Sequence, residues 1–209
     1  MLVEEIMSRD PVTIEPSADL SQAWELMRQR RIRHLPVTEG KTLVGILSDR
    51  DLRDASPSIL EPQGRDFLQS TPVKTIMRTP VITIHPLETI EEAARLLYEH
   101  RIGCLPVESQ GELVGIVTET DILRSLVRML GADRAGSHLE VVVPDRPGML
   151  AEVAGIIRDH QVNINSALTT PGPGEGEKTL VFRLQVMDTR KIVKDIEAAG
   201  YRIRLPFSS

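Results

Sequence analysis

The sequence predicts an α+β chain made of three small units, two copies of a β-α-β-β-α module followed by a ferredoxin-like β-α-β-β-α-β domain. Three observations predict this fold class. Residues up to about 127 repeat themselves, and a different pattern begins at residue 138. The composition of the 209-residue chain, with 41% hydrophobic and 26% charged residues, is typical of globular domains.

The internal repeat runs at a constant offset of 70 residues without a gap. The matched segments are Ile6-Met7 and Ile76-Met77, Thr13-Ile14 and Thr83-Ile84, Leu35-Pro36-Val37 and Leu105-Pro106-Val107, Leu43-Val44-Gly45-Ile46 and Leu113-Val114-Gly115-Ile116, and Asp51 and Asp121. Chance does not align so many positions in one register. The two segments are therefore copies of one structural module.

Each copy shows the same succession of strand and helix patterns. In the first copy we expect a short strand at 11–14, a helix at 17–30 capped by Ser17 or Asp19, strands at 34–37 and 43–47, and a helix at 49–55. The second copy predicts these elements at 81–84, 88–99, 104–107, 113–117 and 119–129. Because one copy alone buries little apolar surface, we expect the two to pack face to face around a pseudo-two-fold axis.

The C-terminal part has its own pattern. We expect strands at 139–143, 162–168, 179–186 and 201–205, a helix whose inward residues are Leu150, Val153, Ile156 and Ile157, and a helix at 190–199 stopped by Gly200. The segment 171–176 is rich in glycine and proline, and is best interpreted as a hairpin connection. This order of elements is the ferredoxin-like pattern.

Charge and composition exclude several classes of function. The net charge of -5, with 25 basic and 30 acidic residues, argues against a nucleic-acid partner. No apolar stretch has the length of a signal peptide or a membrane-spanning helix, so we expect a cytoplasmic protein without a membrane partner. Cys104 is the single cysteine and is interpreted as a small buried hydrophobic residue, and the histidines show no metal-ligand spacing. We therefore predict no metal site and no catalytic residues.

A hydroxyl residue three positions before an aspartate follows a predicted strand in both copies, as Ser48 with Asp51 and as Thr118 with Asp121. The hydroxyl would lie at a helix N-cap, where free N–H groups and the helix dipole favour a phosphate, and the carboxylate could accept hydrogen bonds from ribose hydroxyls. The same spacing also describes a capping box, which needs no ligand. The residues alone leave both interpretations open.

The duplicated module closely resembles a tandem pair of cystathionine-β-synthase (CBS) domains. The resemblance rests on the Ile-Met pair opening each copy, on the Arg-Ile-x-x-Leu-Pro-Val run, and on the segments 45–51 and 115–121. It implies repeats at 1–60 and 74–128 with a linker at 61–73. It also implies that clefts between the repeats bind an adenine nucleotide, AMP, ADP or ATP, with S-adenosylmethionine as a further candidate. Carried over by position, the nucleotide-binding residues are Ser8, Thr13, Ile32, Arg33, His34, Ser48 and Asp51 in the first copy and Arg78, Thr83, Ile102, Gly103, Cys104, Thr118 and Asp121 in the second.

The two copies differ where the resemblance places phosphate. Arg33 and His34 carry hydrogen-bond donors, whereas their counterparts Gly103 and Cys104 carry no charge. We therefore expect asymmetric binding, with the cleft that contains Arg33 preferring ligands of higher phosphate charge. The alternative is that Arg33 is a solvated arginine at a helix end.

The C-terminal part resembles the ACT domain in the segments 145–150 and 162–164. The resemblance implies an ACT domain at 138–209, after a linker at 129–137, that forms a homodimer and can bind an amino acid or a related metabolite between paired copies. The implied site residues are Asp145, Gly148, Met149, Leu150, Asn163 and Ile164. The alternative is structural, a helix-start turn at Gly148 and an asparagine at a strand entry.

The order of domains is similar to that of the bacterial acetoin-utilisation accessory proteins. It implies a non-catalytic regulator of an unidentified enzyme in acetoin or related carbon metabolism, with no cofactor other than a regulatory ligand. The alternatives are a purely structural oligomerisation module without a small-molecule ligand and an enzyme of unrecognised chemistry.

Overall fold

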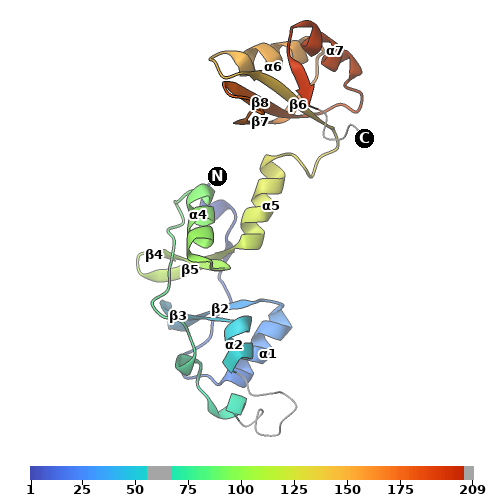
Figure 1. Cartoon of the computed structure of the whole chain (residues 1–209). Helices are drawn as coiled ribbons and strands as arrows, with labels where there is room; N and C mark the ends of the chain where they lie inside the picture. The colour runs from blue at the N-terminus through green and yellow to red at the C-terminus, as the bar shows by residue number, and fades with distance from the viewer. Residues whose placement is uncertain (56–66, 205–209) are drawn as a thin grey trace. The chain divides into compact units, whose positions relative to one another are not determined.

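A computed structural model describes residues 1–55 and 67–204 (Figure 1). The α+β fold class is confirmed. The chain divides into two compact units, of which the first is Met1–Leu123 and the second begins at Arg124. Residues 56–60 of the expected first repeat and residues 61–66 of the linker expected at 61–73 lie outside the described residues, as do residues 205–209 of the expected last strand and C-terminal end.

The first unit contains the duplicated module. The first repeat consists of α1 (Leu20–Arg30), β2 (His34–Glu39), β3 (Thr42–Ser48) and α2 (Asp49–Ala55). The second consists of α4 (Ile90–His100), β4 (Cys104–Ser109), β5 (Glu112–Thr118) and α5 (Glu119–Met129). Every one of these elements except α5, which is longer than α2, keeps the same length at the offset of 70 residues, so the sequence repeat is a structural repeat.

Matching signals define the first helix of each repeat. The side chain of Asp19 accepts a hydrogen bond from the N–H of Gln22 at the start of α1, and Thr89 caps α4 in the same way. Both helices end at an arginine in the left-handed conformation, Arg31 and Arg101, each with a φ of 53°. Asp19 is thus the cap of α1, and Ser17, the other candidate, lies before it.

The two repeats exchange short segments. The 3₁₀ helix η1 (Val3–Glu5) precedes the first repeat in the chain, but Val3 is fully buried in the core of the second. The 3₁₀ helix η2 (Val73–Thr75) precedes the second repeat, and Val73 is fully buried in the core of the first. The strand β1 (Ser8–Arg9) follows the same rule and pairs with β5. Each repeat therefore completes the core of the other.

The strands expected at 11–14 and 81–84 do not form as continuous strands. Each segment makes only an isolated parallel bridge, from Ile14 to Val37 and from Ile84 to Val107. Ile14 uses both backbone groups there: its N–H donates to Pro36 and its carbonyl accepts from Thr38.

The second unit is a four-stranded antiparallel sheet in the order β7-β8-β6-β9. Its elements are β6 (Ser137–Pro144), α6 (Met149–Asp159), β7 (Ile164–Pro171), β8 (Glu177–Leu184), α7 (Arg190–Ala198) and β9 (Arg202–Arg204). Both helices cover the same face of the sheet (Figure 1). The β-α-β-β-α-β order confirms the ferredoxin-like pattern, and the glycine-rich segment before Glu177 is the β7–β8 hairpin connection as expected.

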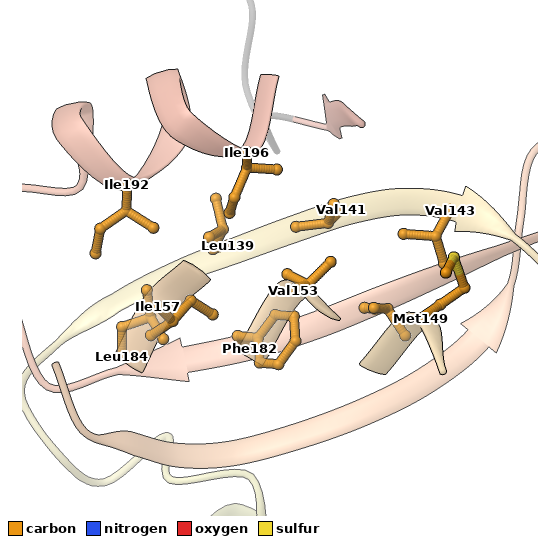
Figure 2. Packing of buried hydrophobic residues seen from close by; sticks show 11 residues of the cluster. Leu139, Val141, Val143, Met149, Val153, Ile157, Phe182, Leu184, Ile192 and Ile196 are labelled. Atoms are coloured by element: carbon orange, nitrogen blue, oxygen red, sulfur yellow. The ribbon is translucent and has the colours of Figure 1, made fainter. Parts of the chain in front are cut away.

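The helices of the second unit are held by an aliphatic core around one aromatic ring (Figure 2). Phe182 on β8 is fully buried, and Val153 and Ile157 of α6 are fully buried beside it. Leu150, which the periodicity places inside, is instead 43% exposed. It stands in the first turn of α6, where Met149 takes the inward position next to the sheet.

Candidate functional site

A cleft of about 400 Å³ lies between the two repeats of the first unit. Strands β2, β3 and β4, the starts of α2 and α5, and the segment 78–82 provide its walls. Its size is within the range of small-molecule sites. Eight of the expected nucleotide-binding residues line it: Arg33, His34, Ser48, Asp51, Arg78, Ile102, Gly103 and Cys104.

Ser48 and Asp51 form a reciprocal pair at the start of α2. The Ser48 N–H donates to Asp51 Oδ2 at 2.9 Å, and the Asp51 N–H donates to Ser48 Oγ at 3.2 Å. Thr118 and Asp121 repeat this arrangement at the start of α5, with 3.0 Å for the first contact. This is the geometry of a capping box. The capping interpretation is thus confirmed for both copies, and a ligand role needs separate support.

Arg78 is the additional partner of Asp51. Its Nε donates to Asp51 Oδ1 at 2.7 Å and its Nη2 lies 2.6 Å from the same oxygen. By position in the repeat, Ser8 was expected beside Asp51 and Arg78 beside Asp121. The structure reverses this grouping, because Arg78 bridges to Ile46 of β3 whereas Ser8 pairs with β5. The exchange of segments between the repeats is the physical reason.

These contacts keep Asp51 ionised. Burial alone would raise the pKa of its carboxyl, but hydrogen bonds from Arg78 and Ser48 outweigh the burial and hold the pKa below its ordinary value. The Cys104 thiol is in the opposite situation, because burial, with the negative charge of Glu119, raises its pKa to about 12. Cys104 is therefore a neutral lining group, which agrees with its interpretation as a small buried hydrophobic residue.

His34 lies against the backbone of Gly103 where the two repeats meet. A Cβ atom placed on Gly103 would be 2.8 Å from His34 Nε2, which is closer than such atoms approach each other. A side chain at position 103 would therefore force the imidazole to move. Burial lowers the pKa of His34, and the neighbouring Arg33 lowers it further, against the opposing influence of Asp49, Glu119 and Asp51.

The lowered pKa of His34 predicts a loss of stability on acidification. The folded state disfavours the imidazolium, so unfolding takes up a proton once the pH falls below about 6.5, the ordinary value. The stabilisation is present above that pH and is lost as the pH falls through the folded pKa. Between pH 7.5 and pH 5.5, the wild type should lose more free energy of unfolding than His34→Gln in urea titrations followed by Trp24 fluorescence. Equal losses in the two proteins would contradict this assignment.

The rest of the cleft separates into basic and apolar surfaces. The arginines are Arg33, Arg50, Arg53, Arg78 and Arg101, against three carboxylates, Asp49, Asp51 and Glu119. The apolar wall consists of Ile46, Pro80, Val81, Ile82, Ile102 and Pro106. Such a site suits a ligand with a flat apolar part and a negatively charged part. Two other hollows are lined by Glu15 with Asp19 and by Glu15 with Glu39, and therefore lack this excess of positive charge.

Several lining residues were not expected from the sequence. Arg101 belongs to the repeated Arg-Ile pair, and this pair was the sequence signal that could have identified it. Its place in the wall of the cleft depends on the left-handed turn that ends α4. Arg50 and Arg53 follow Ser48 on α2 and carried no signal besides their charge. Conversely, the remaining expected residues, Ser8, Thr13, Ile32, Thr83, Thr118 and Asp121, do not line this cleft. Ile32 packs against the core of the first repeat instead.

The expected residues of the second unit lie at two ends of its sheet. Gly148 adopts a φ of 91° at the start of α6, just beyond the end of β6 where Pro144 pairs with Glu177. Asn163 precedes β7 at the end where Ile164 pairs with Leu184. Along β8 these two ends are seven residues apart, which is roughly 23 Å at the rise per residue of a β-strand. One copy of the domain therefore does not bring Gly148 and Asn163 together.

The individual side chains at these ends have local partners. Asp145 forms an ion pair with Lys178 at 2.7 Å, and Asn163 Nδ2 donates to Gln185 at 3.3 Å. Met149 packs in the core, whereas Leu150 and Ile164 are partly exposed to solvent. These contacts agree with the structural alternative for the turn at Gly148 and do not by themselves assemble a binding site.

Two features are absent from the residues described, 1–55 and 67–204. Among them, no group of three or more histidine, cysteine, aspartate or glutamate side chains could hold a metal ion. None of the helices in that part of the chain combines the length and the apolar character needed to cross a membrane.

The solved structures that are similar to this chain include proteins that match 59–66% of it, about the share of the two repeats. A Vibrio cholerae protein named for acetoin utilization (AcuB) is 34% identical, with a TM-score of 0.55 and 95% of its chain covered. The CBS domain pair of MJ0100, in complex with 5-methylthioadenosine and S-adenosyl-L-methionine, is 27% identical, with a TM-score of 0.53 and 98% covered. CBSX2 in complex with AMP is 28% identical, with a TM-score of 0.52 and 96% covered.

Family models identify the parts of the chain. The CBS domain model matches residues 3–58 and 73–128, and the ACT domain model matches residues 137–200. Domains of both kinds typically have regulatory, non-catalytic roles. The chain belongs to the CBS-domain family, as a tandem CBS pair followed by a C-terminal ACT domain.

Proposed function

We propose that the chain is a non-catalytic regulatory protein that binds an adenine nucleotide in the cleft between its CBS repeats. The observation that carries the proposal is the arrangement of three groups in one cleft: the carboxylate of Asp51, the apolar wall around Val81, and an excess of arginines that includes Arg33. They suit a ribose, an adenine and a phosphate group respectively. Two related CBS structures hold adenosine compounds, which supports the ligand class.

The charge of the cleft favours phosphorylated ligands. Five arginines face three carboxylates, and no phenylalanine, tyrosine or tryptophan among the described residues lines the cleft, so recognition depends on the apolar wall and on charge. S-adenosylmethionine carries a sulfonium and an ammonium beside its one carboxylate, so its net charge is positive and it gains less from the arginines than a phosphate does. We therefore place ATP and ADP above AMP, and AMP above S-adenosylmethionine, in expected affinity.

The proposed role of the second unit is assembly. Two copies of the ACT domain would form a homodimer, and a site for an amino acid would combine Gly148 of one copy with Asn163 of the other, since one domain holds them at opposite ends. A nucleotide that binds one arrangement of the CBS pair more tightly would shift the population of that arrangement. The regulated process is proposed as acetoin or related carbon metabolism, which rests on the name of one related structure.

Calorimetric titration of the full chain with AMP, ADP and ATP tests the proposed function together with the role of Arg33. Arg33→Ala should lower the affinity for ATP about 10-fold and the affinity for AMP by less, because one charge-assisted contact to a phosphate is lost. Arg28→Ala is the matched control, since Arg28 is an equally exposed arginine that pairs with Glu25 on α1 outside the cleft.

Two outcomes would contradict this account. If none of the three nucleotides and no S-adenosylmethionine produced heat or a thermal shift with the wild type, the chain would be a structural assembly module whose capping boxes need no ligand. If Arg33→Ala and Arg28→Ala bound ATP equally well, Arg33 would be a solvated arginine at the end of α1.

A further inference from the structure

The ribose-binding carboxylate of the proposed site is already occupied by the protein itself. Asp51 is 8% exposed in its side chain, and both of its oxygens have partners: Oδ2 accepts from Ser48, and Oδ1 accepts two contacts from the guanidinium of Arg78. A ribose that used Asp51 would compete for the oxygen that Arg78 holds. The contact with Ser48 belongs to the capping box that starts α2, so the contact with Arg78 is the one that can be exchanged.

Arg78 is built to exchange its side-chain partner while its backbone stays in place. Its N–H donates to Ile46 at 2.8 Å and its carbonyl accepts from Ile46 at 3.1 Å, so the backbone is fixed to β3. The side chain, by contrast, is 69% exposed. An arginine that releases Asp51 therefore stays hydrated and does not leave a buried charge without a partner.

The second repeat has a serine in place of this arginine. Ser8 occupies the position of Arg78, with the same offset and the same place on the sheet, since Ser8 pairs with Ile116 of β5 as Arg78 bridges to Ile46 of β3. A serine side chain is too short to form a two-point contact with a carboxylate. An arginine at this position of the sheet is thus a property of one repeat and not of the module.

We infer that Arg78 is a latch on Asp51 that makes this cleft selective for phosphorylated adenosine ligands over the free nucleoside, an inference that rests on the proposed function. Binding of the ribose hydroxyls to Asp51 displaces the guanidinium of Arg78. With a di- or triphosphate, the displaced guanidinium gains a phosphate contact in the same cleft, where it adds to Arg33 and Arg53. With adenosine, the contact to Asp51 is lost and no anion replaces it.

The latch predicts effects of opposite sign for two ligands of one protein. Arg78→Gln should raise the affinity for adenosine at least about 3-fold, because no guanidinium has to be displaced, and lower the affinity for ATP about 10-fold. Arg28→Gln, which removes an exposed arginine outside the cleft, should change neither affinity. Calorimetry of the full chain with adenosine and with ATP measures both affinities.

Arg78→Lys provides a second variant with the charge retained. Lysine offers a single-point contact to Asp51, so adenosine should again bind more tightly than to wild type while ATP loses less affinity than in Arg78→Gln. We expect both variants to fold, because the side chain of Arg78 is mostly exposed. Far-UV circular dichroism verifies this.

The outcomes separate the latch from the proposed function. Parallel changes of the two affinities in both Arg78 variants, or a weaker binding of adenosine, would overturn the latch while leaving nucleotide binding in place. If neither compound bound to the wild type or to any variant, the proposed function would fail and the latch with it.

Discussion

Asp51→Ala is expected to weaken the binding of ATP or AMP about 100-fold in the cleft between the CBS repeats. The carboxylate of Asp51 is the one buried anion of the cleft, and it faces the place where we put the ribose. Two hydrogen bonds from ribose hydroxyls to a carboxylate contribute roughly 1.5–3 kcal/mol each, so their loss corresponds to at least that factor. Calorimetric titration of the full chain measures the change directly.

Asp121→Ala is the matched control for this prediction. Asp121 forms the same capping box with Thr118, so both variants lose a similar local stabilisation at a helix start, about 1 kcal/mol. Asp121 does not line the described cleft. A large loss of affinity for Asp51→Ala beside a small one for Asp121→Ala would therefore locate the ligand, and unchanged affinity in both variants would show that the assignment of the site is wrong.

Measurement of the unfolding transition distinguishes a loss of ligand binding from a loss of folding in Asp51→Ala. Asp51→Ala also removes the partner of Arg78, but Arg78 is mostly exposed and keeps its solvation. Trp24 is the only tryptophan of the chain and packs against the core of the first repeat, so its fluorescence reports whether that repeat remains folded. Asp51→Asn keeps the shape of the side chain without the charge and should lose affinity with a smaller change in stability.

The elements of the fold were predictable because they depend on local signals. The offset of 70 residues relates α1, β2, β3 and the start of α2 to α4, β4, β5 and the start of α5. Asp19, one of the two cap candidates that the sequence offered, caps α1. The exchange of segments was not predictable in this way. A duplicated sequence gives Val3 and Val73 equivalent surroundings, but it does not indicate which of two similar cores each one enters.

The candidate site was likewise predictable where it depends on motifs and not where it depends on the exchange of segments. Ser48, Asp51 and Arg33 came from motifs and do lie in one cleft, whereas the pairing of Arg78 with Asp51 depends on the exchange of segments. Arg101 lies at the cleft because a left-handed turn ends α4, and no single residue type predicts such a turn. In the ACT domain the motif correctly marked the turn at Gly148, but only the register of the strands shows that Asn163 lies at the other end of the sheet.

Phe182→Ala is expected to destabilise the ACT domain by about 3–5 kcal/mol, the range for removing a buried aromatic ring. Phe182 is fully buried at the centre of the core in Figure 2, among residues that all belong to the second unit. A loss of this size is comparable to the whole stability of a small domain. Thermal unfolding followed by far-UV circular dichroism should therefore show a transition that moves to much lower temperature.

Leu150→Ala provides the comparison for this variant. Leu150 is a large hydrophobic residue on α6 of the same domain, but it is 43% exposed, so its removal should cost less than about 1 kcal/mol. The CBS pair has separate cores, so Trp24 fluorescence and nucleotide binding should be retained in Phe182→Ala, while sedimentation should show the loss of the proposed homodimer. If nucleotide binding disappeared together with the ACT transition, the sensing cleft would depend on the assembly domain, and the division of roles proposed for the two units would be wrong.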